Sequence, residues 1–362
     1  MSILISINGR FISQRLTGVQ RYALETVLAL DKLLTNMPPS QQLRCELLVP
    51  RGSTWRSGDL NTIKIRQIGR FTGHLWEQLE LPIYAQGVLL NFCNSYPLLA
   101  WKPIVTVHDA AIYAAPGGYK LTYRLFYRLL FSALRWRRSI PVLTDSAFSA
   151  FQLQRYIKIP QQRINVIHCG ADHWASVEPD DSILTRLNLT PKTFVLGVAS
   201  ENPNKNLARL INAFERISNP SLRLVLVGGK NSQVFAKIAG TDSARVVRAG
   251  HVTDRELAAL YQAATCFAFP SLYEGFGIPP LEAMTFGCPV LSSREASLPE
   301  VCGDAALYCN GYEEQSISEG LTTMLDAADT RKKLIELGHT RIKQFKWKST
   351  AEQVLSCVRA LT

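Results

Sequence analysis

Short runs of aliphatic and β-branched residues alternate with helical stretches along the whole chain of 362 residues. Such runs are typical of buried strands, and the first half of the sequence contains a set of them: Ser2–Ile7, Arg44–Val49, Val88–Phe92, Ile104–His108, Pro141–Thr144 and Ile164–His168. The pattern then repeats in the second half, at Phe194–Val198, Leu222–Val227, Ala244–Arg248, Cys266–Phe269, Pro289–Leu291 and Ala306–Tyr308. Apolar strands separated by helices indicate parallel sheets covered on both faces. Because this length also exceeds what one hydrophobic core usually holds, the sequence predicts an α/β protein with two Rossmann-like, doubly wound domains.

A polar stretch, Ala171–Asp181, separates the two sets of strands and marks the expected domain boundary. We place an N-terminal domain at residues 1–173 and a second domain at residues 174–345. Residues 346–362 then form an apolar-periodic C-terminal helix. Each of the two domains is long enough to bury a core of its own.

Composition narrows the class of protein. Hydrophobic residues make up 47% and charged residues 19% of the chain, values typical of a protein folded nearly end to end. The N-terminus, Met1–Ile7, enters a strand pattern directly and lacks the charged start and cleavage site of a signal peptide. No apolar run is long enough to span a membrane, and the eight cysteines are scattered without a Cys-x-x-Cys pair. We therefore expect a cytoplasmic protein with neither a disulfide nor a zinc framework.

Positive charge is concentrated in the first half of the chain. Residues 1–180 contain 20 Lys and Arg against 11 Asp and Glu, whereas residues 181–362 contain 20 against 18. Much of the excess follows helical spacing, at Lys120, Arg124, Arg128, Arg135 and Arg138. Another face of the same helix would carry the apolar residues Leu121, Leu125, Phe126, Leu130 and Leu134.

Two interpretations of this basic helix compete: an interfacial helix drawn to anionic lipid, or a core helix whose outer stripe is basic. We favour the core helix, with proximity to the inner face of a membrane as an added role. The charge also suggests an anionic or membrane-linked substrate. A nucleic-acid partner is not expected, since no recognised binding motif accompanies the charge.

The segment from Phe269 to Val301 is the most informative for function. An apolar strand ending at Phe269 is followed by a Gly-Phe-Gly turn, Gly275–Gly277, and by a helix with prolines in its first turn. Helix starts at the carboxyl end of a parallel sheet hold anions such as a diphosphate, and glycines let backbone amides approach a ligand. Glu274 before the turn and Glu282 after it can accept hydroxyl hydrogen bonds on either side of that phosphate. The combination favours a nucleotide-sugar site.

The spacing of Glu274 and Glu282 and the residues between them resemble the signature of the retaining glycosyltransferases of family four, which have the GT-B fold. The resemblance implies two domains facing a central cleft, with the acceptor on the first domain and a nucleoside-diphosphate sugar on the second. It also implies that the C-terminal helix crosses back to the first domain. Glu274 would hold the sugar hydroxyls and Glu282 the ribose hydroxyls. Further donor contacts would come from Gly275, Phe276, Gly277 and Ile278.

The same resemblance assigns the donor's diphosphate to the start of the second domain. Lys205 matches the lysine of a basic pair, but the arginine usually found five positions earlier is Ser200, and the glycine before it is Ala199. Ser200 can donate a hydroxyl hydrogen bond, although it lacks the charge and the bidentate fork of arginine. Asn202, between Ser200 and Lys205, completes the expected phosphate side of the site.

Three further positions follow from the resemblance. The backbone around Val252 would bond the nucleotide base, and it leaves the base itself unidentified. His108 ends a buried strand at the edge where open sheets bind ligands, and it matches a histidine beside the transferred sugar. A hydrogen-bonded structural histidine is the alternative for His108. Gly18 follows the first strand as the family's donor-contacting loop does, at a helix start suited to anions. We take His108 and Glu274 as the catalytic candidates.

The chain contains no Asp-x-Asp triplet, the carboxylate motif with which GT-A enzymes hold a divalent cation against the diphosphate. Helix starts, Ser200 and Lys205 would have to neutralise the leaving group instead. We therefore expect no metal site and no cofactor.

The predicted function is transfer of a hexose, with retention of configuration, from a nucleoside-diphosphate sugar to an acceptor hydroxyl. The acceptor would be a carbohydrate or a lipid-linked oligosaccharide in polysaccharide synthesis. We favour a UDP-hexose such as UDP-glucose as donor over GDP-mannose. One alternative is a sugar-nucleotide epimerase or a phosphorylase of the same fold. Another is a non-catalytic nucleotide-sugar-binding protein, which the departures at Ala199 and Ser200 favour.

Overall fold

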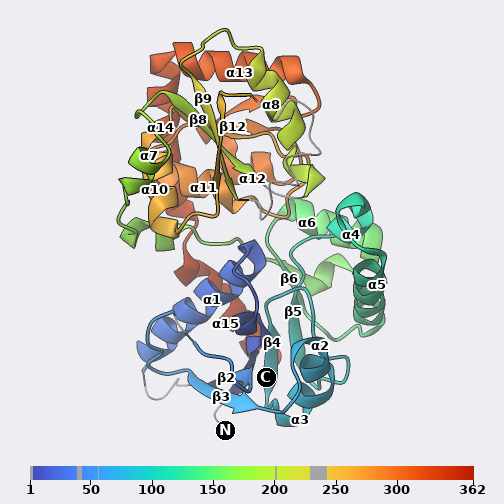
Figure 1. The fold of residues 1–362 in the computed structure, drawn as a ribbon. Helices are drawn as coiled ribbons and strands as arrows, with labels where there is room; N and C mark the ends of the chain where they lie inside the picture. Colours follow the sequence, from blue (N-terminus) through green and yellow to red (C-terminus); the bar gives the residue numbers. More distant parts are fainter. Residues whose placement is uncertain (1–2, 39–42, 56, 200–201, 229–242) are drawn as a thin grey trace. The chain divides into compact units, whose positions relative to one another are not determined.

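The computed structural model describes residues 3–38, 43–55, 57–199, 202–228 and 243–362. The chain divides into two compact units (Figure 1): unit 1 comprises Met1–Gly170 with Lys346–Thr362, and unit 2 comprises Ala171–Phe345. Each unit contains a parallel sheet. The predicted α/β fold with two doubly wound parallel-sheet domains is confirmed.

Within the described residues, the sheet of unit 1 has seven strands in the order β3-β2-β1-β4-β5-β6-β7. The strands are β1 (Leu4–Asn8), β2 (Arg44–Pro50), β3 (Lys64–Ile68), β4 (Val88–Asn91), β5 (Pro103–Thr106), β6 (Val142–Thr144) and β7 (Ile164–Val166). The sequence analysis missed β3. This edge strand carries mainly polar side chains, of which only Ile68 is buried, so it lacks the apolar run that identifies the inner strands.

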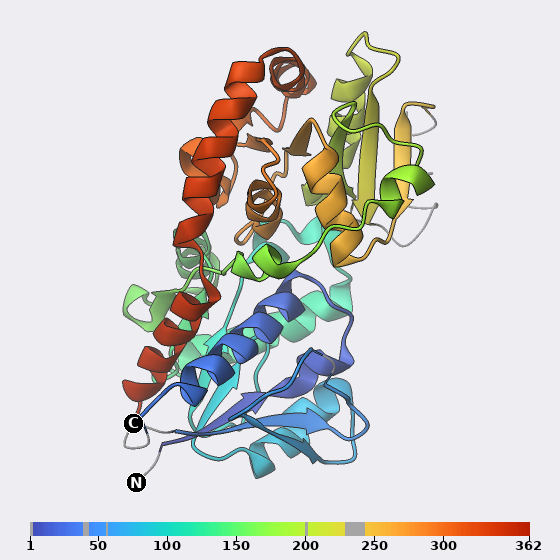
Figure 2. The same cartoon turned by 90° about the vertical axis from the view of Figure 1, so that its left-hand side faces the viewer.

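The helices of unit 1 cover both faces of its sheet. They are α1 (Gly18–Thr35), α2 (Gly73–Leu75), α3 (Leu81–Tyr84), α4 (Ala111–Ala114), α5 (Leu121–Trp136), α6 (Ala147–Gln152) and α15 (Trp347–Arg359), with a π-helical turn, η3 (Trp76–Glu80), between α2 and α3. The C-terminal helix α15 lies along α1 (Figures 1 and 2), where the rings of Tyr22 and Trp347 meet edge to face at 5.9 Å. On the other face, α5 and η3 pack against the strands in two apolar clusters.

The basic helix predicted near residues 119–138 is α5. Its buried face consists of Tyr127, Leu130, Phe131 and Leu134. The assignment of Leu121 and Leu125 to the core-facing side is wrong, because these side chains are 66% and 57% exposed. Nine positions amount to about 2.5 helical turns, so Leu121 and Leu125 lie on the side of α5 opposite Leu130 and Leu134 rather than on the same face.

The sheet of unit 2 has six strands in the described residues, in the order β10-β9-β8-β11-β12-β13. The strands are β8 (Phe194–Ala199), β9 (Arg223–Gly228), β10 (Val246–Gly250), β11 (Cys266–Phe269), β12 (Val290–Ser293) and β13 (Ala306–Cys309). The helices are α7 (Ser182–Arg186), α8 (Leu207–Glu215), α10 (Asp254–Ala263), α11 (Ile278–Thr285), α12 (Leu298–Cys302), α13 (Glu314–Asp326) and α14 (Ala328–Arg341). The strand order reverses between β8 and β11, which makes the carboxyl ends of these two strands the expected ligand site.

No helix among the described residues is long and apolar enough to cross a lipid bilayer.

Candidate functional site

The segments that follow β8 and β11 meet at the point where the strand order of unit 2 reverses. After β8, a short 3-10 turn (Pro203–Lys205) leads into Asn206, whose side-chain amide donates to Pro270 O at 2.9 Å and to Gly311 O at 2.5 Å. The backbone N–H of Leu272 donates to Asn204 O at 2.7 Å. These bonds fix the loop after β8 against the loop after β11, so the predicted lysine and glutamate are brought together.

Lys205 and Glu274 form a direct ion pair. Lys205 Nζ lies 2.7 Å from Glu274 Oε1 and 4.8 Å from the centre of the Phe269 ring. The two side chains are only 20% and 13% exposed, and Ser271 Oγ lies 2.5 Å from the same carboxylate oxygen. The lysine predicted for the phosphate and the glutamate predicted for the sugar are therefore neighbours. A bound diphosphate would compete with Glu274 for the charge of Lys205.

The Gly275–Gly277 turn is held from behind by Ser297, whose Oγ lies 3.0 Å from Glu274 O and 2.7 Å from Phe276 O. Gly277 has a φ of +97°, and a Cβ there would lie 2.7 Å from Leu298 Cδ2. This position therefore requires glycine for two reasons, backbone conformation and space. The ring of Phe276 is buried against Phe345, with ring centres 5.7 Å apart, so only the backbone of Phe276 is placed to bind a ligand.

Helix α11 begins at Ile278 with Pro279 and Pro280 in its first turn. Because proline has no N–H, the anion-binding capacity of the first helical turn is reduced to the N–H group of Ile278. The glycine amides of the preceding turn would have to supply further donors.

Glu282 lies farther along α11 and accepts a hydrogen bond of 3.1 Å from Tyr261 Oη of α10. Burial and the neighbouring Glu282 carboxylate raise the pKa of the Tyr261 hydroxyl well above its ordinary value. The same α10 starts directly after Val252, with a capping box formed by Thr253 and Glu256. Helix α10 thus links the loop predicted to bind the base with the glutamate predicted to bind the ribose.

The structure describes Asn202 but not Ser200, which lies outside the described residues. The Asn202 side chain accepts a 3.0 Å hydrogen bond from Asn204 N and caps the 3-10 turn that ends at Lys205. Asn202 therefore shapes the turn that presents the lysine.

In unit 1, His108 follows β5 and is buried. Its Nδ1 donates to Asp145 Oδ2 at 2.6 Å, and its Nε2 donates to Phe92 O at 2.8 Å. Burial disfavours the charged ring, but the Asp145 carboxylate outweighs it and raises the pKa of His108 above its ordinary value. With both ring nitrogens donating inside the protein, the arrangement suits a fixed, positively charged imidazolium better than a group that exchanges protons with a substrate.

Gly18 is the first residue of α1, and no atom lies within 4 Å of the position of a Cβ there. Sequence reasoning missed Asp145, which follows β6 and orients His108. A polar residue directly after a short apolar strand was the available signal.

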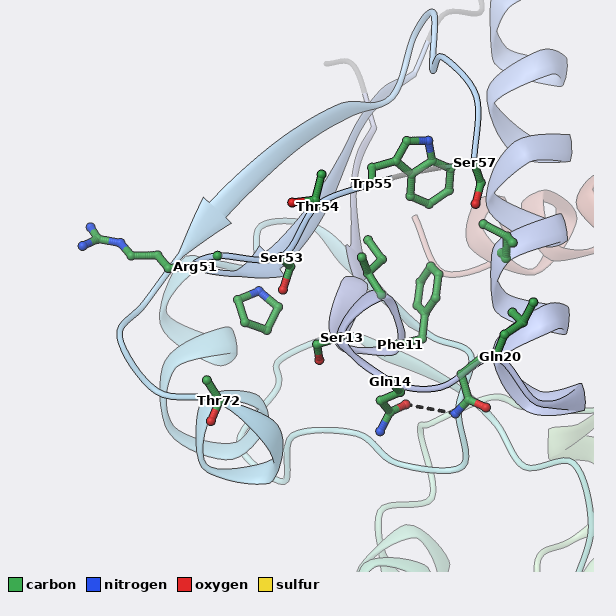
Figure 3. A pocket seen from close by; sticks show the side chains of 15 residues that line it. Phe11, Ser13, Gln14, Gln20, Arg51, Ser53, Thr54, Trp55, Ser57 and Thr72 are labelled. Carbon is green, nitrogen blue, oxygen red and sulfur yellow. Dashed lines mark hydrogen bonds between the residues drawn. The ribbon is translucent and has the colours of Figure 1, made fainter. Parts of the chain in front are cut away.

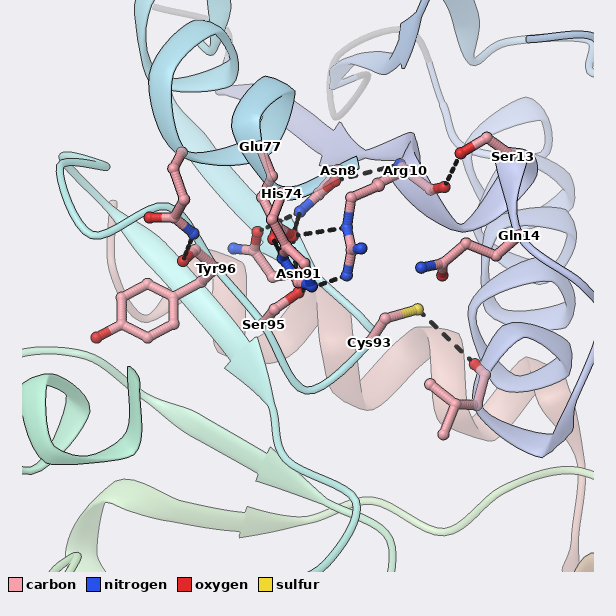
Figure 4. Close-up of polar contacts among 12 residues, drawn as sticks. Asn8, Arg10, Ser13, Gln14, His74, Glu77, Asn91, Cys93, Ser95 and Tyr96 are labelled. Carbon is pink, nitrogen blue, oxygen red and sulfur yellow. Dashed lines mark hydrogen bonds and ion pairs between the residues drawn. The ribbon is translucent and has the colours of Figure 1, made fainter. Parts of the chain in front are cut away.

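Sequence reasoning also missed a buried polar cluster in unit 1 (Figure 4). Arg10 Nε lies 3.2 Å from Glu77 Oε1, and Ser95 Oγ donates to the same oxygen at 2.7 Å. Asn8 Nδ2 donates to it at 2.8 Å, and His74 Nδ1 lies 2.9 Å from Glu77 Oε2. This cluster joins the carboxyl ends of β1 and β4, where the strand order of unit 1 reverses.

A cavity of about 500 Å³ lies in unit 1 beside the segments that follow β1 and β2 (Figure 3). Phe11 and Trp55 contribute aromatic side chains, and Gln14 and Gln20 are joined by a 2.9 Å hydrogen bond at its edge. Its remaining polar lining is mostly hydroxyl groups, from Ser13, Ser53, Thr54, Ser57 and Thr72. Aromatic faces combined with neutral donors and acceptors suit a sugar ring, which has both apolar C–H faces and hydroxyls.

Comparison with known proteins finds relatives of this chain. The sequence model of the family described as "Glycosyl transferases group 1" matches residues 183–341. The chain is 30% identical over 271 residues to the Escherichia coli O-antigen chain mannosyltransferase B, covering 72% of this chain and 71% of that protein. It is 28% identical over 284 residues to the MMP alpha-(1->4)-mannosyltransferase of Mycolicibacterium hassiacum, covering 75% and 67%.

Solved structures share the fold over the whole chain at low sequence identity. The sucrose-phosphate synthase of Thermosynechococcus elongatus has a TM-score of 0.75 at 17% identity, covering 100% of this chain and 99% of that one. The Anabaena protein HepE, in complex with UDP and glucose, has a TM-score of 0.73 at 15% identity, covering 99% and 100%. The resemblance predicted from the segment around Glu274 and Glu282 is confirmed: the chain belongs to the group 1 glycosyltransferases and has their GT-B fold.

Proposed function

We propose that this glycosyltransferase moves a mannosyl residue from a nucleoside-diphosphate donor to an acceptor hydroxyl, with retention of anomeric configuration. The observation that carries the proposal is the Lys205–Glu274 pair at the reversal point of the unit 2 sheet, in a chain similar to two mannosyltransferases. GDP-mannose is the donor we favour. A UDP-hexose, the donor favoured from the sequence, is the second candidate.

The donor residues have distinct proposed roles. Lys205 neutralises the diphosphate as it leaves, while Glu274, released from the ion pair, accepts hydrogen bonds from the sugar hydroxyls. The Gly275–Gly277 amides bind the sugar hydroxyls together with Glu274, and Glu282 binds the ribose hydroxyls. Tyr261 supports Glu282, because its hydroxyl donates a hydrogen bond to one carboxylate oxygen and so helps to fix the position of the side chain.

In unit 1, the charged ring of His108 and the helix start at Gly18 would stabilise negative charge that develops as the glycosidic bond breaks. The cavity beside Trp55 is the proposed place for a sugar of the acceptor glycan, since its lining is rich in hydroxyls and includes two aromatic side chains, with Arg51 as its charged residue. An acceptor in O-antigen-like polysaccharide synthesis, on a lipid carrier, is consistent with the activity named for the Escherichia coli relative.

A binding and transfer experiment tests this proposal. Calorimetry should show that GDP binds at least about tenfold more tightly than UDP or ADP, a difference of roughly 1.4 kcal/mol. GDP-mannose with a mannose-terminated oligosaccharide should then yield an elongated glycan. Tighter binding of UDP would favour a UDP-hexose as the donor instead. Release of an epimer or of free sugar without any acceptor would contradict glycosyl transfer.

Transfer should need no divalent cation, because Lys205, His108 and helix starts supply the positive charge. We expect the rate after treatment with excess EDTA to stay within about twofold of the untreated rate. In a metal-dependent enzyme, removal of the Lewis acid costs several kcal/mol of transition-state stabilisation. An enzyme that is inactive in EDTA and recovers with manganese would overturn this part of the mechanism.

A further inference from the structure

Exposed apolar side chains gather on unit 1. In the part of the chain that the structure describes, every large apolar side chain that is exposed belongs to this unit except Tyr312. Single exposed apolar residues are normal on any protein, whereas contiguous ones mark an interaction surface. These residues therefore indicate an interaction surface only if they lie next to one another.

Two helical segments each present an apolar stripe to solvent. On α5, Leu121, Leu125, Leu129 and Trp136 are exposed on the side opposite the buried face. The continuous helical run of α2, η3 and α3 does the same with Leu75, Leu79 and Ile83, which are spaced four residues apart. The loop between β4 and β5 adds Leu99 and Trp101, which are 81% and 88% exposed. Side chains this exposed contribute nothing to the core.

Direct contacts join the three segments. The His74 ring of α2 packs on Phe126 of α5 with 4.3 Å between ring centres. Leu98 N donates to Gln78 Oε1 of η3 at 3.0 Å. Arg137, directly after α5, donates to Leu98 O at 2.8 Å and to Ala100 O at 2.7 Å. Figure 1 shows α2, α3 and α5 on the same side of the sheet. We call the exposed sides of residues 73–84, 98–102 and 120–138 the apolar face of unit 1.

The surroundings of this apolar face are strongly positive. Residues 70–138 contain eight Lys and Arg against three Asp and Glu. Of the three acidic residues, Glu77 is buried in its ion pair, and Glu80 accepts hydrogen bonds from the backbone N–H groups of Arg70 and Phe71. Two copies of this chain meeting through the apolar face would place like charges together, which disfavours self-association.

We propose that the apolar face docks unit 1 on an anionic lipid bilayer. Leucine and tryptophan side chains enter the boundary between headgroups and acyl chains, while Lys102, Lys120, Arg124 and Arg135 contact the lipid phosphates. Neither interaction alone would hold the protein firmly. Salt screens the attraction between exposed charges and lipid phosphates, and no helix among the described residues is long and apolar enough to cross the bilayer. The proposal does not depend on which sugar is transferred.

Vesicle sedimentation of the full chain tests the proposal. With vesicles of phosphatidylcholine and about 30 mol% phosphatidylglycerol, we expect the protein to pellet, and to do so at least about tenfold less with phosphatidylcholine alone. Leu99→Ser with Trp101→Ser should lower the partition coefficient on anionic vesicles by about tenfold or more, and so should Leu121→Ser with Leu125→Ser. Raising NaCl from about 0.05 M to about 0.5 M should weaken binding of the native protein.

Tyr312→Ser is the matched control, because it removes an exposed aromatic side chain from unit 2 and should leave vesicle binding unchanged. Thermal unfolding of each variant should match the native protein, as expected for exposed positions. Equal pelleting with neutral and anionic vesicles would overturn the proposal. So would light scattering that shows a dimer of the native protein which the two double variants abolish, because the apolar face would then bind a second copy.

Discussion

Replacing Glu274 with alanine should lower kcat/KM for glycosyl transfer by on the order of 100-fold or more, since the hydrogen bonds from sugar hydroxyls that we propose for this charged carboxylate would be lost. In the structure Glu274 is bound by Lys205 and Ser271 and is mostly buried, so its position is fixed before any donor arrives. A carboxylate held in place loses less conformational entropy on binding than a mobile one, and Ser271 still holds Glu274 when the ion pair with Lys205 opens. Initial rates over a range of donor concentrations measure the effect.

Two variants separate the roles within the ion pair. Lys205→Ala should mainly weaken binding of the free nucleoside diphosphate, measured by calorimetry. Glu274→Ala should leave nucleoside diphosphate binding within about threefold or strengthen it, because Lys205 loses its competitor. Glu314→Ala is the matched control: it breaks the exposed Arg216–Glu314 pair of the same unit and should not change turnover. Unchanged turnover in both Glu274→Ala and Lys205→Ala would rule out this donor site.

Replacing Glu77 with glutamine should destabilise the protein by about 3 kcal/mol or more, which is typical when a buried ion pair loses one partner. The Arg10 guanidinium would stay buried without a counterion. Such a loss corresponds to a fall in Tm of roughly 6–12 °C for a unit of this size. Calorimetric or circular-dichroism melting measures it. Glu46→Gln is the matched control, since the Glu46–Arg66 pair is more exposed and should contribute at most about 1 kcal/mol.

Burial opposes the charge on Glu77, but hydrogen bonds and the charge of Arg10 outweigh it and lower the pKa of the carboxyl below its ordinary value. The ionised form therefore stabilises the folded state above the pKa of the unfolded chain, and this stabilisation is lost as the pH falls through the lower folded pKa. Glu77→Gln should remove this acid-dependent part of the stability. Arg10→Met combined with Glu77→Gln should be less destabilised than Glu77→Gln alone, because no unpaired charge remains. Equal stability of the single and double variants would show that the charge of Arg10 is not the cause.

The fold was accessible from the sequence because apolar runs and turns are local signals. All the inner strands of both sheets lie within the predicted runs or within a few residues of them. The edge strand β3 was missed because its polar side chains carry no such signal. The donor segment was equally accessible, since a strand, the Gly275–Gly277 turn and α11 follow one another in the chain.

The pairing of distant residues was not accessible. Lys205 and Glu274 are separated by 69 positions and Arg10 and Glu77 by 67, and nothing local states that either pair forms an ion pair. The same holds for Asp145, which pairs with His108 and raises the pKa of its ring above the ordinary value. A sequence identifies residues that can bind a ligand or form an ion pair. Their partners depend on which loops the strand order of the sheet brings together.

Exposure was the other property that only the folded chain decided. The sequence analysis placed Leu121 and Leu125 on one apolar face with Leu130 and Leu134, but they lie on the opposite side of α5, which the sheet leaves uncovered. The sequence by itself therefore determined two parallel-sheet domains, their family and the segment that we propose as the donor site, because these depend on local patterns along the chain. The tertiary structure alone decided the ion pairs, the state of His108 and the apolar face of unit 1, because these depend on contacts between segments far apart in sequence and on what is left uncovered.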